Sequence, residues 1–496
     1  MHFFVNFPLF SVVACLICSV VSGCLPGSHA RRLSLLLTGA VSLTSALLLA
    51  YILKTGTPVE YLMGHYPHPW GNELRISLLE PLFSMAFSAI MFLCLLGGRK
   101  QLLEDLQPEK QNLYYVMADL VQSALLVLVY TNDLFTGYVF IEICTLASCG
   151  LLMIRQLGRT TLASVRYMIF SLVGSGLFLM GVVVLYNVTG HLLMPDLKDT
   201  VAALWSHSRY TLPLTAAICL MTVGIAIKSG LFPCHFWMPD TYGFATPSSA
   251  GILSGLVSKG YIFFLIKIIF DVFGTEVFYA SGVQNVLYAM GALGIVVGSI
   301  SAMREKDCFR MIAFSSAAQI GYIYMGIGIS ARLGVLAALF HILAHAVTKP
   351  PLFLAAAQLS DTAGGNKKFR ALQGAAWSNR LAGASFTMEA FSMIGLPLTT
   401  GFISKYLFAI SAFRANVKLL PTLIVLAVST VLNTIYFART IIRLYGRPSA
   451  PLADPLPLRA QPSFGLAAVL FAALNLLTGI WASPLVELLR QGLELF

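Results

Sequence analysis

Long apolar runs without charge dominate the sequence, and they constrain the fold more than any other feature. The run from Tyr167 to Tyr186, YMIFSLVGSGLFLMGVVVLY, is uncharged and matches the roughly 20 apolar residues that a helix needs to cross a bilayer. Of the 496 residues, 57% are hydrophobic and only 11% are charged, against roughly 25% in a soluble domain. We therefore expect an all-α polytopic membrane protein, because a transmembrane barrel would show short segments of alternating polarity.

Charged loops and Gly/Pro clusters divide the apolar sequence into about 14 predicted transmembrane helices. The first run lacks a positively charged leader and a cleavage site, so we expect it to remain as a helix. The predicted helices lie near 8–24, 33–53, 76–97, 113–131, 133–154, 161–187, 211–233, 248–272, 281–303, 310–329, 333–358, 383–413, 418–444 and 463–486.

Basic residues are distributed unevenly between alternate loops. Of the 32 Lys and Arg residues, 19 lie on one side, 8 on the other and five within the predicted spans. The positive-inside rule assigns the richer side to the cytoplasm and both termini to the outside. The net charge of +11 is explained by this orientation, and no basic run with interleaved aromatic residues predicts nucleic-acid binding.

No motif predicts a cofactor or a metal in this chain. The phosphate-binding patterns GxGxxG and GxxxxGK[ST] are absent. The nine cysteines are scattered, mostly within apolar runs, without the two CxxC pairs that could hold zinc or an iron–sulfur cluster. We expect them to be small core residues, and we expect no redox or catalytic centre in this chain.

Ionisable residues inside the predicted spans are the candidates for function. Each costs roughly 2.5–3.5 kcal/mol near the centre of a span, so a group of them indicates a role. Lys267 lies near a helix end, where snorkelling or helix pairing explains its charge. The other residues of this kind are Glu142, Lys228, Lys259, His341, His345, Lys349, Glu389 and Lys405.

Two of the predicted helices are interrupted next to a lysine. Gly230 and Pro233 follow Lys228, and Gly395 and Pro397 precede Lys405. Proline lacks an N–H donor and clashes with the preceding turn, and broken helices at membrane depth line wet cavities or lie buried in protein. The two breaks lie five spans apart, which indicates two repeated halves, spans 4–8 and 9–13.

The eleventh predicted span places His341, His345 and Lys349 four residues apart, which makes one stripe about 12 Å long. A low-dielectric environment disfavours the charged form of a lysine, and a nearby carboxylate favours it. A carboxylate that approaches and withdraws can therefore make a lysine bind and release a proton. Histidine, with an ordinary pKa of about 6.5, is suited to relaying protons. These residue types favour H⁺ over Na⁺, which prefers clustered oxygen ligands.

At these residues the sequence resembles the antiporter-like membrane subunits shared by respiratory complex I (NADH:quinone oxidoreductase), Mrp-type cation/proton antiporters and energy-converting membrane-bound hydrogenases. The resemblance covers about the whole length, and the lysine at 405 favours the D-type Mrp subunit or the complex I members with lysine there. The matching motifs are VFIE at 139–142, IKSGLFPCHFWMPDTY around Lys228, SGLVSKGY around Lys259, DCFRMIAFSSAAQIGY at 307–322, HxxxHxxxK at 341–349 and GLPLTTGFISKY around Lys405.

The resemblance implies a 14-helix fold with broken helices 7 and 12 and two inverted five-helix repeats. The corresponding domains are 1–112 with helices 1–3, 113–272 and 273–445 as the two repeats, and 446–496 with a loop and helix 14. The sequence departs from the family in Pro350 and Pro351, which follow Lys349, and in the additional carboxylate of Glu389. The resemblance implies a proton relay through Glu142, Lys228, Lys259, His341, His345, Lys349 and Lys405.

The resulting prediction is a proton-translocating subunit of a redox-driven pump or of an Mrp-type Na⁺/H⁺ antiporter, in a prokaryotic cytoplasmic membrane. Its partners would be other membrane subunits, including homologous antiporter-like ones, and any electron transfer would take place elsewhere in an oxidoreductase complex. Two alternatives stay open. One is a stand-alone secondary transporter of an organic solute, with a substrate pocket between the halves. The other is a structural subunit whose charges only pair helices.

Overall fold

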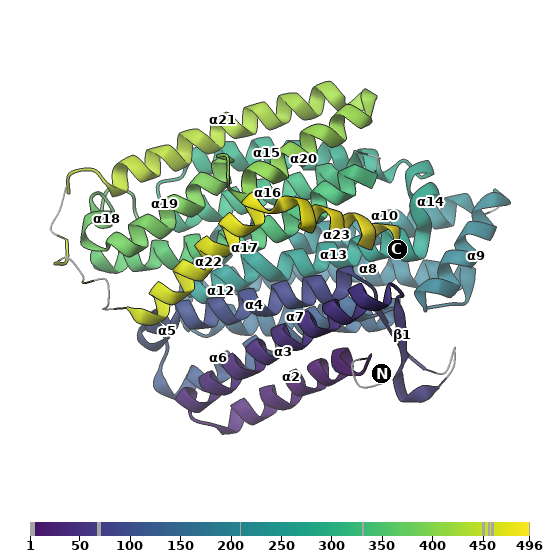
Figure 1. Ribbon diagram of the computed structural model, residues 1–496, viewed down its shortest axis with the longest axis horizontal. Coiled ribbons are helices and arrows are strands. Elements are labelled where there is room, and N and C mark those ends of the chain that lie inside the picture. Colours follow the sequence, from purple (N-terminus) through teal and green to yellow (C-terminus); the bar gives the residue numbers. More distant parts are fainter. Residues whose placement is uncertain are drawn as a thin grey trace.

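The computed structural model describes residues 5–66, 71–208, 210–329, 332–448, 452–454, 457 and 461–495. Arg209 and Arg459, which the count of basic loop residues includes, lie outside them. The elements, labelled as in Figure 1, are α2 (Phe7–Cys24), α3 (Gly27–Thr55), β1 (Val59–Leu62), η1 (Met63–His65), β2 (Glu73–Ile76), α4 (Leu79–Gly97), α5 (Arg99–Asp105), η2 (Pro108–Lys110), α6 (Gln111–Tyr130), α7 (Leu134–Met153), α8 (Gly158–Thr189), α9 (Met194–Ser206), α10 (Thr211–Ser229), α11 (Met238–Phe244), α12 (Pro247–Ile252), η3 (Leu253–Val257), α13 (Ser258–Ile268), η4 (Ile269–Phe273), α14 (Gly274–Ala280), α15 (Val283–Arg304), α16 (Cys308–Gly328), α17 (Arg332–Thr362), α18 (Ala375–Ser378), α19 (Arg380–Ile394), α20 (Thr400–Arg414), η5 (Asn416–Lys418), α21 (Leu419–Leu444), α22 (Pro462–Ile480) and α23 (Ala482–Glu494).

Twelve helical segments in the described residues are long and apolar enough to cross a membrane. They confirm the prediction of an all-α polytopic membrane protein. Three further helices, α16, α19 and α20, are not among the twelve. The predicted span 383–413 is in fact two helices, α19 and α20, of 15 residues each, because the chain leaves the helical conformation at Gly395.

The long helices run side by side, and their connections gather at two opposite ends of the molecule (Figure 1). One end carries α5 and α18, and the other carries β1, α9 and α14 (Figure 1). Helices α2 and α3 form one edge and α21 forms the opposite edge (Figure 1). The antiparallel hairpin of β1 and β2 and the short helix α9 were not predicted from the sequence.

The centre of the molecule is built from two unusually buried segments. The apolar window of Pro247–Ala280 is 100% buried and that of Arg332–Thr362 is 94% buried, whereas those of α2 and α21 are each 28% buried. The outer helices therefore leave apolar side chains for lipid, while the two central segments are surrounded by protein. Four of the candidate site residues, Lys259, His341, His345 and Lys349, lie on these two segments.

Helix α17 continues through Pro350 and Pro351 without a break. Pro350 faces η3, where a Cβ atom added to Gly255 would lie 2.8 Å from Pro350 Cγ. The ring of Pro350 therefore fits only because residue 255 has no side chain. The carbonyl groups that a proline leaves free can find other donors within such a buried contact.

Candidate functional site: a row of buried lysines and histidines

The first part of the site is an ion pair between α7 and α10. Lys228 Nζ lies 3.6 Å from Glu142 Oε1, and the lysine side chain is fully buried while the glutamate is 23% exposed. Lys228 Nζ also donates to Thr145 Oγ1 at 2.9 Å and to the Ser171 carbonyl at 3.0 Å. The lysine is thus held mainly by neutral oxygens, with the carboxylate just beyond hydrogen-bond distance.

The local backbone explains why Lys228 can occupy this position. Helix α10 ends at Ser229, and Gly230 takes a left-handed conformation with φ 82°, as the sequence predicts. Gly174 of α8 lies directly against the lysine, where an added Cβ would be 2.7 Å from both Lys228 Cγ and the Gly224 carbonyl oxygen. A glycine at 174 therefore allows α8 and α10 to cross closely enough to enclose the lysine stem.

Lys259 lies in the first turn of α13, directly after a π-helical segment. Its Nζ donates to the Ser254 carbonyl at 2.5 Å, within η3, where the hydrogen-bond pattern is wider than in an α-helix. Ser254 Oγ in turn lies 2.9 Å from Ser316 Oγ of α16. The lysine is completely buried and occupies the centre of the molecule.

Lys349 of α17 reaches the same helix α16. Its Nζ donates to the Ile312 carbonyl at 3.2 Å and to Ser315 Oγ. Ser315 Oγ and Ser316 Oγ both donate to the Ile312 carbonyl, at 2.8 and 3.0 Å, so the anchors of Lys259 and Lys349 meet at one carbonyl of α16. Hydroxyl groups both donate and accept, which makes them suitable intermediates for proton transfer.

The two histidines of α17 line a cavity that has room for roughly one water molecule. His341 Nδ1 lies 2.6 Å from Ser404 Oγ of α20. His341 Nε2 and both ring nitrogens of His345 are buried and have no hydrogen-bond partner among the described residues. The cavity is lined by Gln319, His341, Ala344, His345, Thr348, Ser392, Met393, Gly401 and Lys405.

Lys405 closes the cavity at the second helix break. Its Nζ donates to the Ile394 carbonyl at 2.6 Å and to Thr430 Oγ1 of α21 at 3.1 Å. Ile394 is the last residue of α19, so the ammonium group binds a carbonyl that the end of the helix leaves free. The structure thus brings His341, His345 and Lys405 around one cavity and leaves Glu142 and Lys228 in a separate group.

Glu389 has a specific partner that the sequence did not reveal. Asn475 Nδ2 of α22 donates to Glu389 Oε2 at 2.5 Å, while its Oδ1 accepts from Ser392 Oγ and from the Thr400 amide, both at 3.1 Å. One buried amide therefore joins α22 to both halves of the broken helix. The additional carboxylate is part of the structure that maintains the break.

Sequence reasoning missed four other buried acids, Glu73, Glu80, Asp119 and Asp271. Glu80 Oε1 lies 3.7 Å from Lys267 Nζ, and both side chains are fully buried, so Lys267 is a helix-pairing residue. Asp271 binds Arg75 at 2.8 Å near the same end of the molecule. Asp119 of α6 accepts from Ser22 and Ser34. The sequence could have identified Asp119, because it is the single carboxylate in the apolar run near 113–131.

No group of three or more His, Cys, Asp or Glu side chains that could hold a metal occurs among the residues that the structure describes. Cys15 and Cys18 do form one CxxC spacing, but they lie on α2, where Cys15 is buried and Cys18 is half-buried. The described cysteines are all unpaired.

Comparison with known proteins gives concordant matches. The NADH:quinone oxidoreductase/Mrp antiporter transmembrane family matches residues 131–432. NADH-quinone oxidoreductase subunit N of Desulforudis audaxviator is 33% identical over 435 residues, which cover 86% of this chain and 83% of that protein. A D-type Na⁺/H⁺ antiporter subunit of Alkalihalophilus pseudofirmus is 26% identical, and the match covers 71% of this chain and 69% of that protein.

A solved structure with the same fold was also found. A chain of the membrane-bound sulfane sulfur reductase, an archaeal respiratory membrane complex, superposes with a TM-score of 0.88 at 24% identity. The alignment covers 100% of this chain and 98% of that chain. At this identity the likeness shows a shared fold.

Proposed function

Because the chain belongs to the NADH:quinone oxidoreductase/Mrp antiporter transmembrane family, we propose that it translocates protons as an antiporter-like subunit of a multisubunit membrane complex. The observation that carries this proposal is the pair of Glu142 and Lys228, 3.6 Å apart. A buried lysine held mainly by neutral oxygens can exist in either protonation state, and a small approach of the carboxylate favours the charged one.

The proposed proton route passes through three groups of residues. Lys228 exchanges a proton with Glu142, and the anchors of Lys259 and Lys349 are connected through Ser254, Ser316 and the Ile312 carbonyl. The histidines and Lys405 share the small cavity, where one water can bridge their nitrogen atoms. The complete relay is Glu142, Lys228, Lys259, His341, His345, Lys349 and Lys405.

The number of membrane crossings is part of the proposal. If α16 crosses once and α19 and α20 together cross once as a broken helix, the twelve candidate segments become 14. The two inverted repeats would then be 113–272, which contains the α10 break, and 273–445, which contains the α19/α20 break. Residues 1–112 and 446–496 would flank them. In both repeats the helix break lies beside a lysine, of which Lys228 is buried and Lys405 is half-buried.

For orientation, we infer that the end with α5 and α18 (Figure 1) faces the cytoplasm and that both termini lie outside. An impermeant thiol reagent added outside intact cells should label a cysteine substituted at Lys54 but not one substituted at Arg159 or Arg370. The background should lack the exposed Cys24. Labelling at 159 or 370 and protection at 54 would reverse the orientation.

The proposed setting is a prokaryotic cytoplasmic membrane, with partner subunits that include homologous antiporter-like chains, because the similar proteins named above carry names of subunits. A stand-alone transporter of an organic solute is not favoured, since the cavity at the second break has room for roughly one water. Electron donors and acceptors would bind to other subunits.

The experiment that tests the proposal compares Glu142→Gln and Lys228→Ala in the whole complex, purified from its native membrane and reconstituted in proteoliposomes. Proton uptake, normalised to redox or antiport turnover, should fall to a small fraction of the unsubstituted level while assembly persists. Glu276→Gln and Lys54→Ala make the same chemical changes at exposed positions and should leave proton uptake unchanged. Normal uptake in assembled Glu142→Gln and Lys228→Ala complexes would make the pair structural.

A further inference from the structure

The short helix α11 follows the break at Lys228 and lies directly against it. A Cβ atom added to Gly230 would be 2.4 Å from Met238 Sδ, in the first turn of α11. The Met238 amide donates to the His235 carbonyl at 3.1 Å, which closes the turn between the break and α11. The position of α11 therefore determines the position of the helix end that carries Lys228.

Asp240, also in the first turn of α11, binds two arginines from distant parts of the chain. Its Oδ2 accepts from Arg166 Nη1 of α8 at 2.7 Å, and its Oδ1 accepts from Arg310 Nη1 of α16. Arg166 lies 74 residues from Asp240 in the sequence, and Arg310 lies 70 residues away on the other side. One carboxylate thus uses both oxygens to join α11 to two other helices.

Arg310 is itself held in place by a second acid and by close packing. Its Nε donates to Glu305 Oε2 at 3.2 Å. A Cβ atom added to Gly243 of α11 would lie 3.0 Å from Arg310 Cγ, so α11 packs against the stem of the same side chain that its carboxylate binds. The guanidinium group is therefore a fixed partner for Asp240.

Arg310 lies in the first turn of the helix that anchors two lysines of the relay. Further along α16, the Ile312 carbonyl accepts from Lys349 Nζ at 3.2 Å. The Ser316 hydroxyl of the same helix contacts the residue whose carbonyl accepts from Lys259 Nζ. The ion pair therefore connects the break of α10 to the helix on which the anchors of the next two lysines lie.

A second contact joins α11 to the segment of Lys259. The Tyr242 hydroxyl lies 3.4 Å from Ser258 Oγ, and Ser258 directly precedes Lys259 at the start of α13. The Tyr242 side chain is completely buried. One short helix thus contacts both the break beside Lys228 and the residue next to Lys259.

The last turn of α11 is held by two cations. Arg155 Nη1 donates to the Phe244 carbonyl at 3.1 Å, and Lys367 Nζ donates to the Gly243 carbonyl at 2.8 Å. Carbonyl groups at the end of a helix lack partners within the helix and favour positive charge. Asp240 is the single acidic residue of α11, so it makes the only carboxylate contacts of this helix with the arginines around it.

We propose that Asp240 is a positioning residue, which holds α11, and with it the break at Lys228, in place against α8 and α16. Coupling between distant parts of a protein is carried by packed side chains and ion pairs of this kind. The spacing between Lys228 and the other lysines is then set by charges outside the relay itself. The expected effect on proton uptake rests on the proposed function, whereas the effect on the break is independent of it.

The test uses Cys234, a half-buried cysteine in the turn between Gly230 and α11. The full chain, purified in detergent, reacts with N-ethylmaleimide, and mass spectrometry of the peptide that carries Cys234 gives the rate. Asp240→Asn should make this reaction about threefold to tenfold faster, because the loss of two partly exposed ion pairs eases local opening. Asp240→Glu keeps the charge and should react at nearly the unsubstituted rate.

The matched control is Asp361→Asn. Asp361 of α17 pairs with Lys100 at 2.9 Å, and its side chain is 25% exposed, against 22% for Asp240. This variant also loses a partly exposed ion pair, but one that joins α17 to α5, so it should leave the rate at Cys234 unchanged. If Asp240→Asn does not fold, Arg166→Gln removes one of the two pairs at an exposed position and should make the reaction about threefold faster.

Proton uptake by the reconstituted complex, normalised to turnover, is the second readout. It should fall at least about twofold in Asp240→Asn, recover in Asp240→Glu and stay normal in Asp361→Asn. An unchanged rate at Cys234 in Asp240→Asn would overturn the proposal whatever proton uptake does. A faster rate with normal proton uptake would also overturn it when Glu142→Gln abolishes uptake in the same assay. If Glu142→Gln pumps normally, the proposed function fails, and the rate at Cys234 still decides whether Asp240 holds the break.

Discussion

Replacing Asn475 with leucine tests whether one amide maintains the second helix break. The two side chains are similar in size, so the change removes hydrogen bonds and creates little empty space. Asn475 is fully buried and makes bonds to Glu389 Oε2 at 2.5 Å and to Ser392 Oγ and the Thr400 amide at 3.1 Å. The Ser392 hydroxyl can rotate, but the carboxylate oxygen and the amide each lose a buried partner.

Each such loss costs about 1–3 kcal/mol, so Asn475→Leu should lower the free energy of unfolding by about 2–6 kcal/mol. Unfolding of the purified chain in mixed micelles of increasing SDS content measures this change. Glu389→Leu/Asn475→Leu removes both partners and should be more stable than the sum of the two single changes by at least about 1 kcal/mol. A single Asn475→Leu variant within about 0.5 kcal/mol of the unsubstituted chain would refute the role assigned to Asn475.

Two other substitutions follow from the same structure. Gly174→Ala would place a Cβ 2.7 Å from the Gly224 carbonyl oxygen and from Lys228 Cγ. It should lower the free energy of unfolding in SDS by about 1–3 kcal/mol and reduce proton uptake. Gly176→Ala, where no atom lies within 4 Å of the added Cβ, should change neither. Lys267→Met leaves Glu80 buried without its cation and should lower the free energy of unfolding by about 3–5 kcal/mol. The double variant Lys267→Met/Glu80→Leu should recover part of that loss in the same assay. Equal stability of the single variant and the unsubstituted chain would contradict a buried ion pair.

The helix ends beside the lysines could be predicted because they depend on local sequence. Glycine adopts left-handed conformations readily, and Gly230 and Gly395 indeed have φ 82° and 92°. The long apolar runs likewise predicted most of the helices, since a membrane segment must satisfy its own backbone hydrogen bonds. These features need no knowledge of distant contacts.

Features that depend on residues far apart in the chain could not be predicted. The close packing of Pro350 of α17 against η3 depends on Gly255 on another segment. The partner of Glu389 is Asn475, 86 residues later, and no sequence pattern connects the two. The contacts with α16 that join the anchors of Lys259 and Lys349 are likewise visible only once η3, α16 and α17 are packed together.

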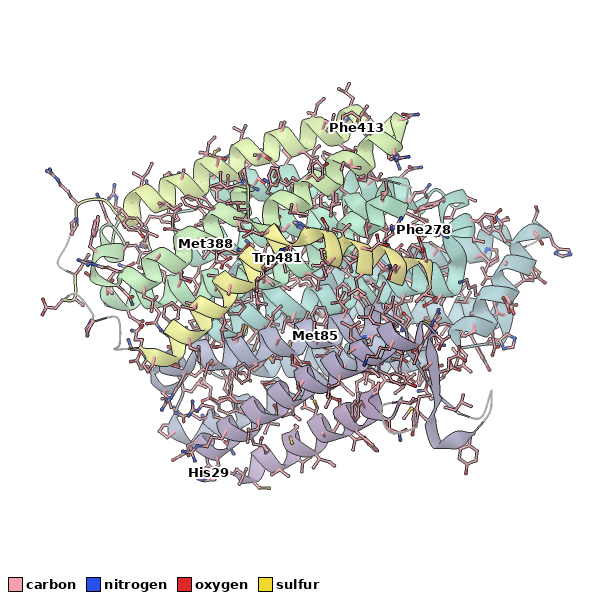
Figure 2. The ribbon with its side chains drawn as sticks, viewed as in Figure 1. His29, Met85, Phe278, Met388, Phe413 and Trp481 are labelled. Carbon is pink, nitrogen blue, oxygen red and sulfur yellow. The ribbon has the colours of Figure 1, made fainter. Side chains whose placement is uncertain are left out.

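Surface structure was also hard to predict. The β1–β2 hairpin, α9 and α23 are short, and none has the apolar length that identifies a membrane helix. Figure 2 shows Trp481 where α22 gives way to α23, and its side chain is 67% exposed. The predicted helix 463–486 therefore runs past the true end of α22 at Ile480.

The central claim is that the buried lysines carry protons and do not only pair helices. The most direct measurement is proton uptake by the reconstituted complex with Lys405→Arg, compared with Lys405→Ala. Arginine keeps the positive charge and can bind the Ile394 carbonyl, but it stays protonated in proteins. If Lys405 releases and reloads a proton, the arginine variant should fail almost as completely as the alanine variant while the complex assembles. Proton uptake near the unsubstituted level in Lys405→Arg would contradict the claim and make Lys405 a fixed cation that holds the broken helix.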